Sequence, residues 1–255
     1  MEKYDYICFV NCISKQTIKL NDMKKIYFAL FMALIMMCGS CSKAVTALPE
    51  GEFTYNVPCR VVNINTDKPV KAIIVLWLHG GVRDIAKHNF FTFNHIDCVD
   101  ADERIMKYLK ESGTKAIVLF PVCHKSWQKE PVAWRDCYDD VKHIIDDYLS
   151  KGLADEKRVY VTGSSDGGVG TWDYAEKHPE MFAAAISMSC SSPRKVDIPI
   201  YFFNTRSEKD CTEKVKALVE QGVNVKYKYC PQYKHGGDAA ECTPELLKEF
   251  FSITK

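Results

Sequence analysis

Residues 158–172 read RVYVTGSSDGGVGTW. The first five of these residues are rich in β-branched and aromatic side chains, which favour a buried strand. They lead directly into the pattern Gly163-x-Ser165-x-Gly167, and a helix-like segment follows. A serine between two glycines at a strand–helix junction is typical of a strained turn that lifts the hydroxyl to the edge of a sheet. We therefore predict that Ser165 is a nucleophile.

Strand-like and helix-like segments alternate on both sides of this turn. Two of the strand-like segments are almost continuously apolar, as expected of strands that are buried on both faces. The alternation predicts an α/β fold with a mostly parallel central sheet, helices on both faces and a single domain over residues 53–255. In such sheets, ligands bind beyond the carboxyl ends of the strands. The expected strands are 70–78, 115–120, 158–162, 183–188, 198–204 and 223–229, and the expected helices are 101–112, 141–149, 212–221 and 244–253, the last with Thr243 as N-cap.

The loop after the first of these strands reads His79-Gly80-Gly81. Backbone N–H groups near Gly81, together with the N–H of Asp166, are placed to hydrogen-bond the oxyanion of a tetrahedral intermediate. We therefore name Gly81 and Asp166 as the oxyanion residues. His79 is expected to be structural, and an ordinary tight turn is the alternative for the two glycines.

A serine nucleophile also needs a general base. In the order serine, acid, histidine, only His178 and His235 follow Ser165 along the chain. His178 ends the helix after the turn, where a surface position is expected because a cation suits a helix C-terminus. His235 lies in the loop after the last strand and is the predicted base.

The acid that orients this base is expected after the strand 198–204, where the loop contains Glu208 and Asp210. Its role is to fix the imidazole tautomer and to stabilise the imidazolium. We prefer Glu208, but the pattern leaves both carboxylates open. The alternative is that both are solvated loop charges.

Several segments resemble a known family. They are RVYVTGSSDGGVGTWDYAEKHPEMFAAAISMS from Arg158, FPVCHKSW from Phe120 and DDVKHIIDDYLSKGLADEKRVY from Asp139. They resemble the α/β-hydrolase esterases grouped as predicted peptidases, feruloyl or acetylxylan esterases and polyhydroxybutyrate-depolymerase-like enzymes. The resemblance extends over roughly residues 70–250. It implies the α/β-hydrolase fold, with Ser165 as nucleophile and His235 as base.

Two features depart from that family. Asp166 stands where these enzymes more often have Met or Asn, and a carboxylate beside a developing oxyanion is unfavourable unless it points away or pairs. The acid loop also lacks the usual G-x-x-D spacing, and Ser207 is a candidate for the place of the acid. This departure leaves the third member of the triad open.

These residues predict a secreted serine hydrolase that cleaves carboxylic esters, on saccharides or in small molecules, through an acyl-enzyme. Trp127, Trp134 and Tyr138 can stack on an aromatic acyl group or a sugar, or can belong to a lid or the core. No metal or organic cofactor is implied. A serine peptidase and a non-catalytic binding lipoprotein on a hydrolase scaffold are the alternatives.

Composition and the N-terminal segment bear on class and location. The chain has 255 residues, is 47% hydrophobic and carries a formal net charge of +1, which excludes a disordered chain and argues against a nucleic-acid partner. Two lysines precede an apolar run at 26–38, as in a secretory signal. Small residues before Cys41 resemble the lipobox of bacterial lipoproteins. We expect a signal peptide at 1–40, of which 1–22 can be an over-called start, then a lipidated tether at 41–52 that holds the protein on a membrane.

The chain has 12 cysteines, of which eight follow Cys41. In an exported domain, eight cysteines are compatible with up to four disulfides. Cys211 follows the acid loop and Cys242 follows the base loop, so we predict a bridge between them that pins acid and base together. No Cys/His cluster has the spacing of a zinc site.

Overall fold

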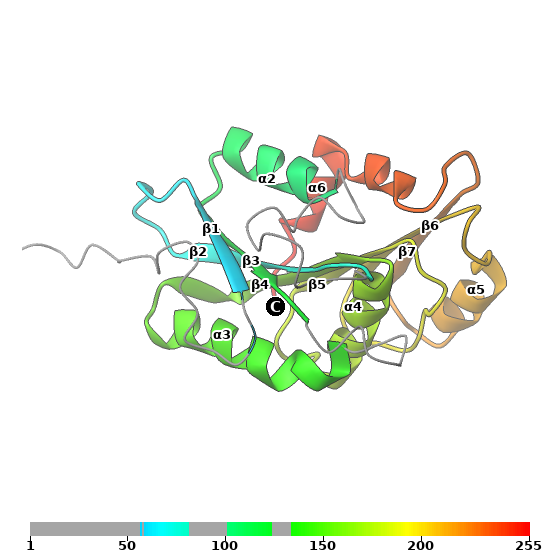
Figure 1. Ribbon diagram of the computed structural model, residues 1–255, viewed down its shortest axis with the longest axis horizontal. Coiled ribbons are helices and arrows are strands. Elements are labelled where there is room, and N and C mark those ends of the chain that lie inside the picture. Colours follow the sequence, from blue (N-terminus) through cyan, green and yellow to red (C-terminus); the bar gives the residue numbers. More distant parts are fainter. Residues whose placement is uncertain (1–56, 58, 82–100, 124–133) are drawn as a thin grey trace, which may run out of the picture. The chain divides into compact units, whose positions relative to one another are not determined.

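A computed structural model describes residues 57, 59–81, 101–123 and 134–255. Within these residues the centre of the fold is a seven-stranded sheet, with strand order β1-β3-β2-β4-β5-β6-β7 (Figure 1). Strand β1 pairs antiparallel with β3, and the other neighbouring strands pair in parallel. The strands are β1 (Cys59–Ile64), β2 (Ala72–Leu78), β3 (Ala116–Pro121), β4 (Ala154–Ser164), β5 (Ala184–Met188), β6 (Ile200–Thr205) and β7 (Val225–Cys230).

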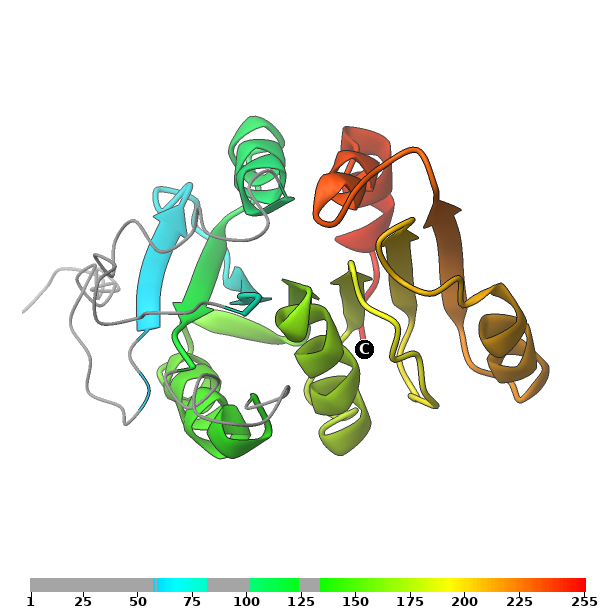
Figure 2. The same ribbon diagram turned by 45° about the vertical axis from the view of Figure 1, so that its right-hand side comes forward.

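Helices cover both faces of the sheet. Residues of α2 and α6 share one buried apolar cluster with one set of strand side chains, and residues of α3, α4 and α5 share a second cluster with the opposite set. Figure 2 shows these two helical layers with the sheet between them. The helices are α2 (Ala101–Glu111), α3 (Tyr138–Ser150), α4 (Asp166–Lys177), α5 (Thr212–Glu220) and α6 (Pro244–Phe250), with short 3₁₀ helices η3 (Trp134–Cys137) and η4 (Gly237–Glu241).

Burial explains the pattern of the strand sequences. Every residue of β2 and β3 is buried, which requires the continuous apolar runs AIIVLWL and AIVLFP because helices pack on both faces. Strand β7 lies at an edge of the sheet and alternates between half-buried and exposed residues along most of its length. The carboxyl ends of β2, β4, β5, β6 and β7 meet at one edge of the sheet because these strands are parallel. That edge is where the candidate site lies.

The predicted fold class is confirmed, and the predicted elements lie close to their observed bounds. Strand β4 begins at Ala154, four residues before the expected start. The side chain of Thr243 accepts a hydrogen bond from the backbone N–H of Leu246, so this residue is the N-cap of α6 as predicted. Strand β1 was not predicted, because the mixed segment CRVVNI lies at an edge and half of its residues are only partly buried.

The predicted bridge between Cys211 and Cys242 is wrong. Cys211 packs in the cluster with α3, α4 and α5, whereas Cys242 packs in the cluster with α2 and α6. The sheet therefore lies between the two thiols, and both are free. Proximity in sequence to the acid and base loops did not reveal that the two loops send these side chains to opposite faces.

The predicted signal peptide at 1–40, the lipidation site Cys41 and the tether at 41–52 lie outside the described residues. Among the residues that are described, no helix is long and apolar enough to span a membrane.

Candidate active site

Ser165 lies at the sharp turn between β4 and α4. Its backbone has φ 58° and ψ −123°, a conformation that residues with a side chain rarely adopt. The backbone N–H of Ser165 donates to the carbonyl of Met188 at the end of β5 (3.0 Å), and its carbonyl accepts from the N–H of Val169 in α4 (3.0 Å). Strained backbone of this kind persists only where the surrounding structure holds it. Here the neighbouring strand and the first turn of α4 do so.

The glycines around Ser165 are required by close packing of backbone against backbone. A Cβ atom at Gly167 would lie 1.9 Å from the carbonyl oxygen of Leu78 in β2, and one at Gly168 would lie 2.3 Å from that of Met188. A Cβ atom at Gly163 would lie 2.4 Å from the carbonyl oxygen of Gly167. No larger residue fits at these places without moving α4 away from the sheet. The predicted role of the glycines in the turn is therefore confirmed.

The side chains of His235 and Glu208 are hydrogen-bonded to each other at the same edge of the sheet. The Nδ1 atom of His235 lies 2.5 Å from Oε1 of Glu208, whose side chain is 8% exposed. The other carboxylate oxygen of Glu208 accepts from the backbone N–H of Thr205 (2.8 Å) and from its hydroxyl (2.7 Å). Burial alone would raise the pKa of Glu208, but the hydrogen bonds from His235 and Thr205 outweigh it and lower the pKa. An ionised Glu208 keeps the proton of His235 on Nδ1 and leaves Nε2 as the basic atom.

The structure brings one of the two predicted acids to His235. Asp210 does not contact His235; its Oδ1 accepts from the N–H and the hydroxyl of Thr212 (2.9 and 2.7 Å) and from the hydroxyl of Tyr227 (3.1 Å). Asp210 therefore stabilises the start of α5, and Glu208 is the predicted acid that contacts His235. Ser207 supports the base loop instead of replacing the acid, because its hydroxyl accepts from the backbone N–H of His235 (2.9 Å).

A second carboxylate, Asp238, supports the loop that contains His235, and the sequence did not predict this role. The hydroxyl of Ser189, just beyond β5, accepts from the backbone N–H of Gly236 (2.8 Å), next to His235. Both the N–H and the hydroxyl of Ser189 donate to Asp238 (2.7 and 2.6 Å). Asp238 is fully buried, and burial raises its pKa to about 6, although the bonds from Ser189 oppose the shift. The only signal in the sequence is an aspartate three residues after the predicted base.

The two predicted oxyanion residues come together in space. A Cβ atom at Gly81 would lie 2.8 Å from Oδ2 of Asp166, so the carboxylate of Asp166 lies against Gly81. The carboxylate is half-buried; burial raises its pKa, and the charge of nearby His235 opposes the shift. Within the described residues the side chain of Asp166 has no hydrogen bond or ion pair. The carboxylate of Asp166 therefore faces the loop that carries Gly81.

His79 has the structural role that its position predicted. Its Nε2 accepts from the backbone N–H of Cys123 (3.0 Å), so its proton lies on Nδ1, which donates to the carbonyl of Gly80 (2.6 Å). Burial lowers its pKa to about 4, and the bond to Gly80 opposes the shift only in part. The indole N–H of Trp134 donates to the carbonyl of His79 (3.1 Å). A neutral imidazole therefore sets the shape of the oxyanion loop.

The predicted substrate contacts of Trp134 and Tyr138 are corrected. Trp134 is fully buried against His79 and Gly170, and Tyr138 is buried with its hydroxyl donating to the carbonyl of Gly170 (3.1 Å). Rings without exposed surface cannot stack on a substrate, so both belong to the core. Trp127 lies outside the described residues.

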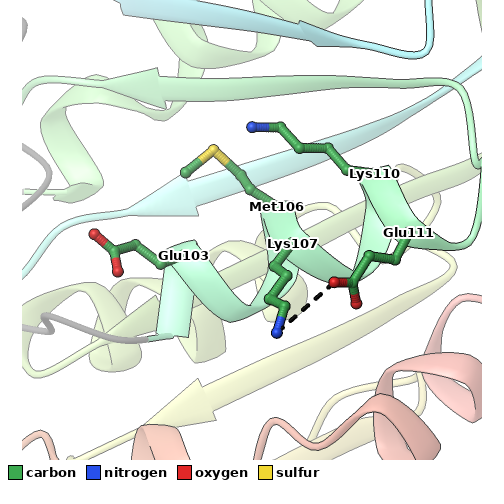
Figure 3. Close-up of a pocket in the computed structure, with 5 residues that line it drawn as sticks. All are labelled: Glu103, Met106, Lys107, Lys110 and Glu111. Atoms are coloured by element: carbon green, nitrogen blue, oxygen red, sulfur yellow. Dashed lines mark ion pairs between the residues drawn. The ribbon is translucent and has the colours of Figure 1, made fainter.

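A shallow hollow elsewhere on the surface does not compete with this site. It is lined by five residues of α2, among which Lys107 and Glu111 form an exposed ion pair (3.7 Å; Figure 3). None of these residues is a nucleophile oriented by a base. Among the described residues, no group of histidine, cysteine and carboxylate side chains is arranged to hold a metal ion.

Comparisons with known proteins agree with this fold. A family model described as the prolyl oligopeptidase family matches residues 132–192, the segment that contains the turn at Ser165. Many solved structures share the arrangement of strands and helices, and several of them are esterases. The protein has the α/β-hydrolase fold. A search of the curated proteins finds no match.

Three of the solved α/β-hydrolases illustrate the extent of the likeness. A thermostable esterase is 24% identical with a TM-score of 0.59; the match covers 78% of this chain and 60% of the esterase, so the chain spans less than two thirds of that protein. An esterase of Rhizomucor miehei is 12% identical (TM-score 0.54; 82% and 87% covered). Est1E from Butyrivibrio proteoclasticus, solved with ferulic acid bound, is 13% identical (TM-score 0.51; 76% and 94% covered).

The contrast between Glu208 and Asp210 gives a matched test. Changing Glu208→Gln removes the anion that orients His235, so we expect kcat for ester hydrolysis to fall by about 10²- to 10⁴-fold. Asp210→Asn, at an exposed position in the same loop, should change kcat by less than about twofold. Steady-state kinetics of both variants with p-nitrophenyl acetate measures this. Equal losses in the two variants would show that the pair with His235 is not the one that matters.

Asp238 predicts a pH dependence of stability. Its folded pKa of about 6 lies above the usual aspartate value, so the folded state holds this proton more tightly than the unfolded chain does. The stabilisation is complete below about pH 4 and is lost as the pH rises through about 6, a change of roughly 2–3 kcal/mol. Asp238→Asn removes this ionisable carboxyl group. The free energy of unfolding of the variant should therefore fall less between pH 4 and 7 than that of the wild type.

Urea unfolding at pH 4, 5, 6 and 7 measures the difference, with Asp210→Asn as the exposed control. Wild-type and Asp238→Asn curves that run parallel across this range would contradict the prediction.

Proposed function

We propose that the protein is a serine hydrolase that cleaves carboxylic esters through an acyl-enzyme intermediate. The observation that carries the proposal is the pairing of His235 with buried Glu208 at the sheet edge where the strained turn presents Ser165. The fold similarity to solved esterases supports an ester substrate.

In this mechanism the hydroxyl of Ser165 attacks the acyl carbonyl while Nε2 of His235 takes its proton. Glu208 stabilises the imidazolium through Nδ1 and stays ionised because hydrogen bonds from His235 and Thr205 favour its anion. His235 then gives the proton to the leaving alcohol. Water hydrolyses the acyl-enzyme by the same proton transfers in reverse order.

The developing oxyanion is stabilised by the backbone N–H of Asp166 and by N–H groups near Gly81. Donors of this kind typically contribute about 2.7–4 kcal/mol each to the transition state. The carboxylate of Asp166 works against them, because an anion near a second developing anion raises the barrier. A substrate with a positive charge close to the scissile carbonyl would offset this repulsion.

We further propose that the substrate is an acyl ester of a saccharide or a small molecule, and that the protein is exported and held on a membrane through lipid at Cys41. The ferulic acid bound to Est1E supports an aromatic acyl group as one test substrate. A serine peptidase is the second candidate, which the match to the prolyl oligopeptidase family over residues 132–192 favours.

Active-site labelling tests the serine mechanism. A fluorophosphonate probe should label the wild type and not Ser165→Ala, and this variant should lose at least about 10³-fold in kcat on p-nitrophenyl acetate. Ser164→Ala, at the buried neighbouring serine, is the matched control and should still be labelled. If the probe does not label the wild type, the serine mechanism is wrong and a non-catalytic binding protein on a hydrolase scaffold is favoured. Turnover of peptide amides above that of feruloyl and acetyl esters would favour the peptidase.

Asp166 gives a prediction about substrate charge. Asp166→Asn removes the anion but keeps the backbone N–H, so kcat/KM for a neutral ester should rise by about tenfold. The same change should lower the preference for an ester with an ammonium group on the acyl chain over its uncharged isostere. Hydrolysis rates of the two esters by wild type and variant measure both effects. An unchanged ratio would show that the carboxylate does not face the substrate.

A further inference from the structure

Two buried cysteines lie side by side behind the oxyanion loop. Cys123 follows β3, and Cys137 is the last residue of η3, directly before α3. Both are fully buried, and their Sγ atoms are 3.1 Å apart. Nonbonded heavy atoms normally stay about 3.5–4.0 Å apart. A disulfide brings the two sulfurs to about 2.0 Å, so its formation needs a shift of only about 1 Å.

The other described cysteines have different surroundings. The thiol of Cys190 contacts the hydroxyl of Ser187 (3.2 Å), and that of Cys242 contacts the thioether of Met188 (3.9 Å). Cys230 lies near a carboxylate oxygen of Glu241 (3.6 Å). Within the described residues, Cys123 and Cys137 are the only cysteines whose thiols contact each other.

The pair is joined on both sides to the loop that carries Gly81. The backbone N–H of Cys123 donates to the imidazole of His79, and Trp134, in the same 3₁₀ helix as Cys137, donates to the carbonyl of His79. The two residues that hold His79 therefore come from two separate segments. A covalent bond between Cys123 and Cys137 would fix those segments to each other.

We propose that Cys123 and Cys137 form a disulfide that fastens the support of the oxyanion loop. The oxidant is a small-molecule or protein disulfide. One cysteine thiolate attacks it to give a mixed disulfide, and the second thiolate displaces the remaining thiol. Two electrons pass to the oxidant, which leaves as two thiols carrying the two protons. Because both cysteines are buried, the oxidant reaches them during folding or in local opening of the chain.

Peptide mapping tests the bond directly. The full chain is incubated with oxidised glutathione near its melting temperature, alkylated with iodoacetamide in denaturant and digested with trypsin. The expected product is residues 116–125 linked to residues 136–142, which disappears after dithiothreitol treatment. Complete alkylation of both peptides would overturn the proposal. So would a link from either one to residues 88–104, which contain Cys98.

Thermal unfolding provides an independent measurement. The bond closes a short loop, so dithiothreitol should lower the melting temperature of the oxidised wild type by about 5–10 °C. Dithiothreitol should leave the melting temperatures of Cys123→Ala and Cys137→Ala unchanged. Cys242→Ala, a buried cysteine on the other face of the sheet, should keep the full response. A shift in the first two variants as large as in the wild type would refute the assignment.

Discussion

The contact between the backbone of α4 and the backbones of β2 and β4 is the constraint on which the rest of the site depends. Gly167 lies so close to the carbonyl of Leu78 that no side chain fits there, and Gly163 faces Gly167 in the same way. With strand and helix this close, the one residue between them that carries the hydroxyl has to take a positive φ. The start of α4 thus places Ser165 and the backbone N–H of Asp166 at the same edge of the sheet.

The acid and the base of the site lie in loops that are far apart along the chain. Glu208 follows β6, His235 follows β7 and Ser189 follows β5, yet hydrogen bonds join all three loops. Two carboxylates support His235 in different ways: Glu208 contacts the imidazole, and Asp238 holds the backbone of its loop through Ser189. Their environments separate them, because hydrogen bonds lower the pKa of Glu208 against its burial while burial raises that of Asp238. The pKa values of the two acids are thus shifted in opposite directions although both support one histidine loop.

The fold and the elbow could be predicted from the sequence because both follow from local patterns. Continuous apolar runs indicate β2 and β3. Three glycines around a serine indicate a tight turn between a strand and a helix, because side chains at those positions would collide with the neighbouring backbone. The choice of Glu208 over Asp210 could not be predicted, because it depends on which of two neighbouring side chains turns inward. The role of Asp238, the burial of Trp134 and the faces of Cys211 and Cys242 were hidden for the same reason. Each depends on contacts between residues distant in the chain.

His79 has a consequence for how the two halves of the site respond to their surroundings. Its buried imidazole gains a proton only near pH 4, so the hydrogen bonds to Cys123 and Gly80 stay the same throughout the neutral range. The imidazole that supports the oxyanion loop is thus uncharged throughout the neutral range. The support of the loop that carries Gly81 is therefore insensitive to pH in the neutral range, and the ionisable group that lies against this loop is the carboxylate of Asp166.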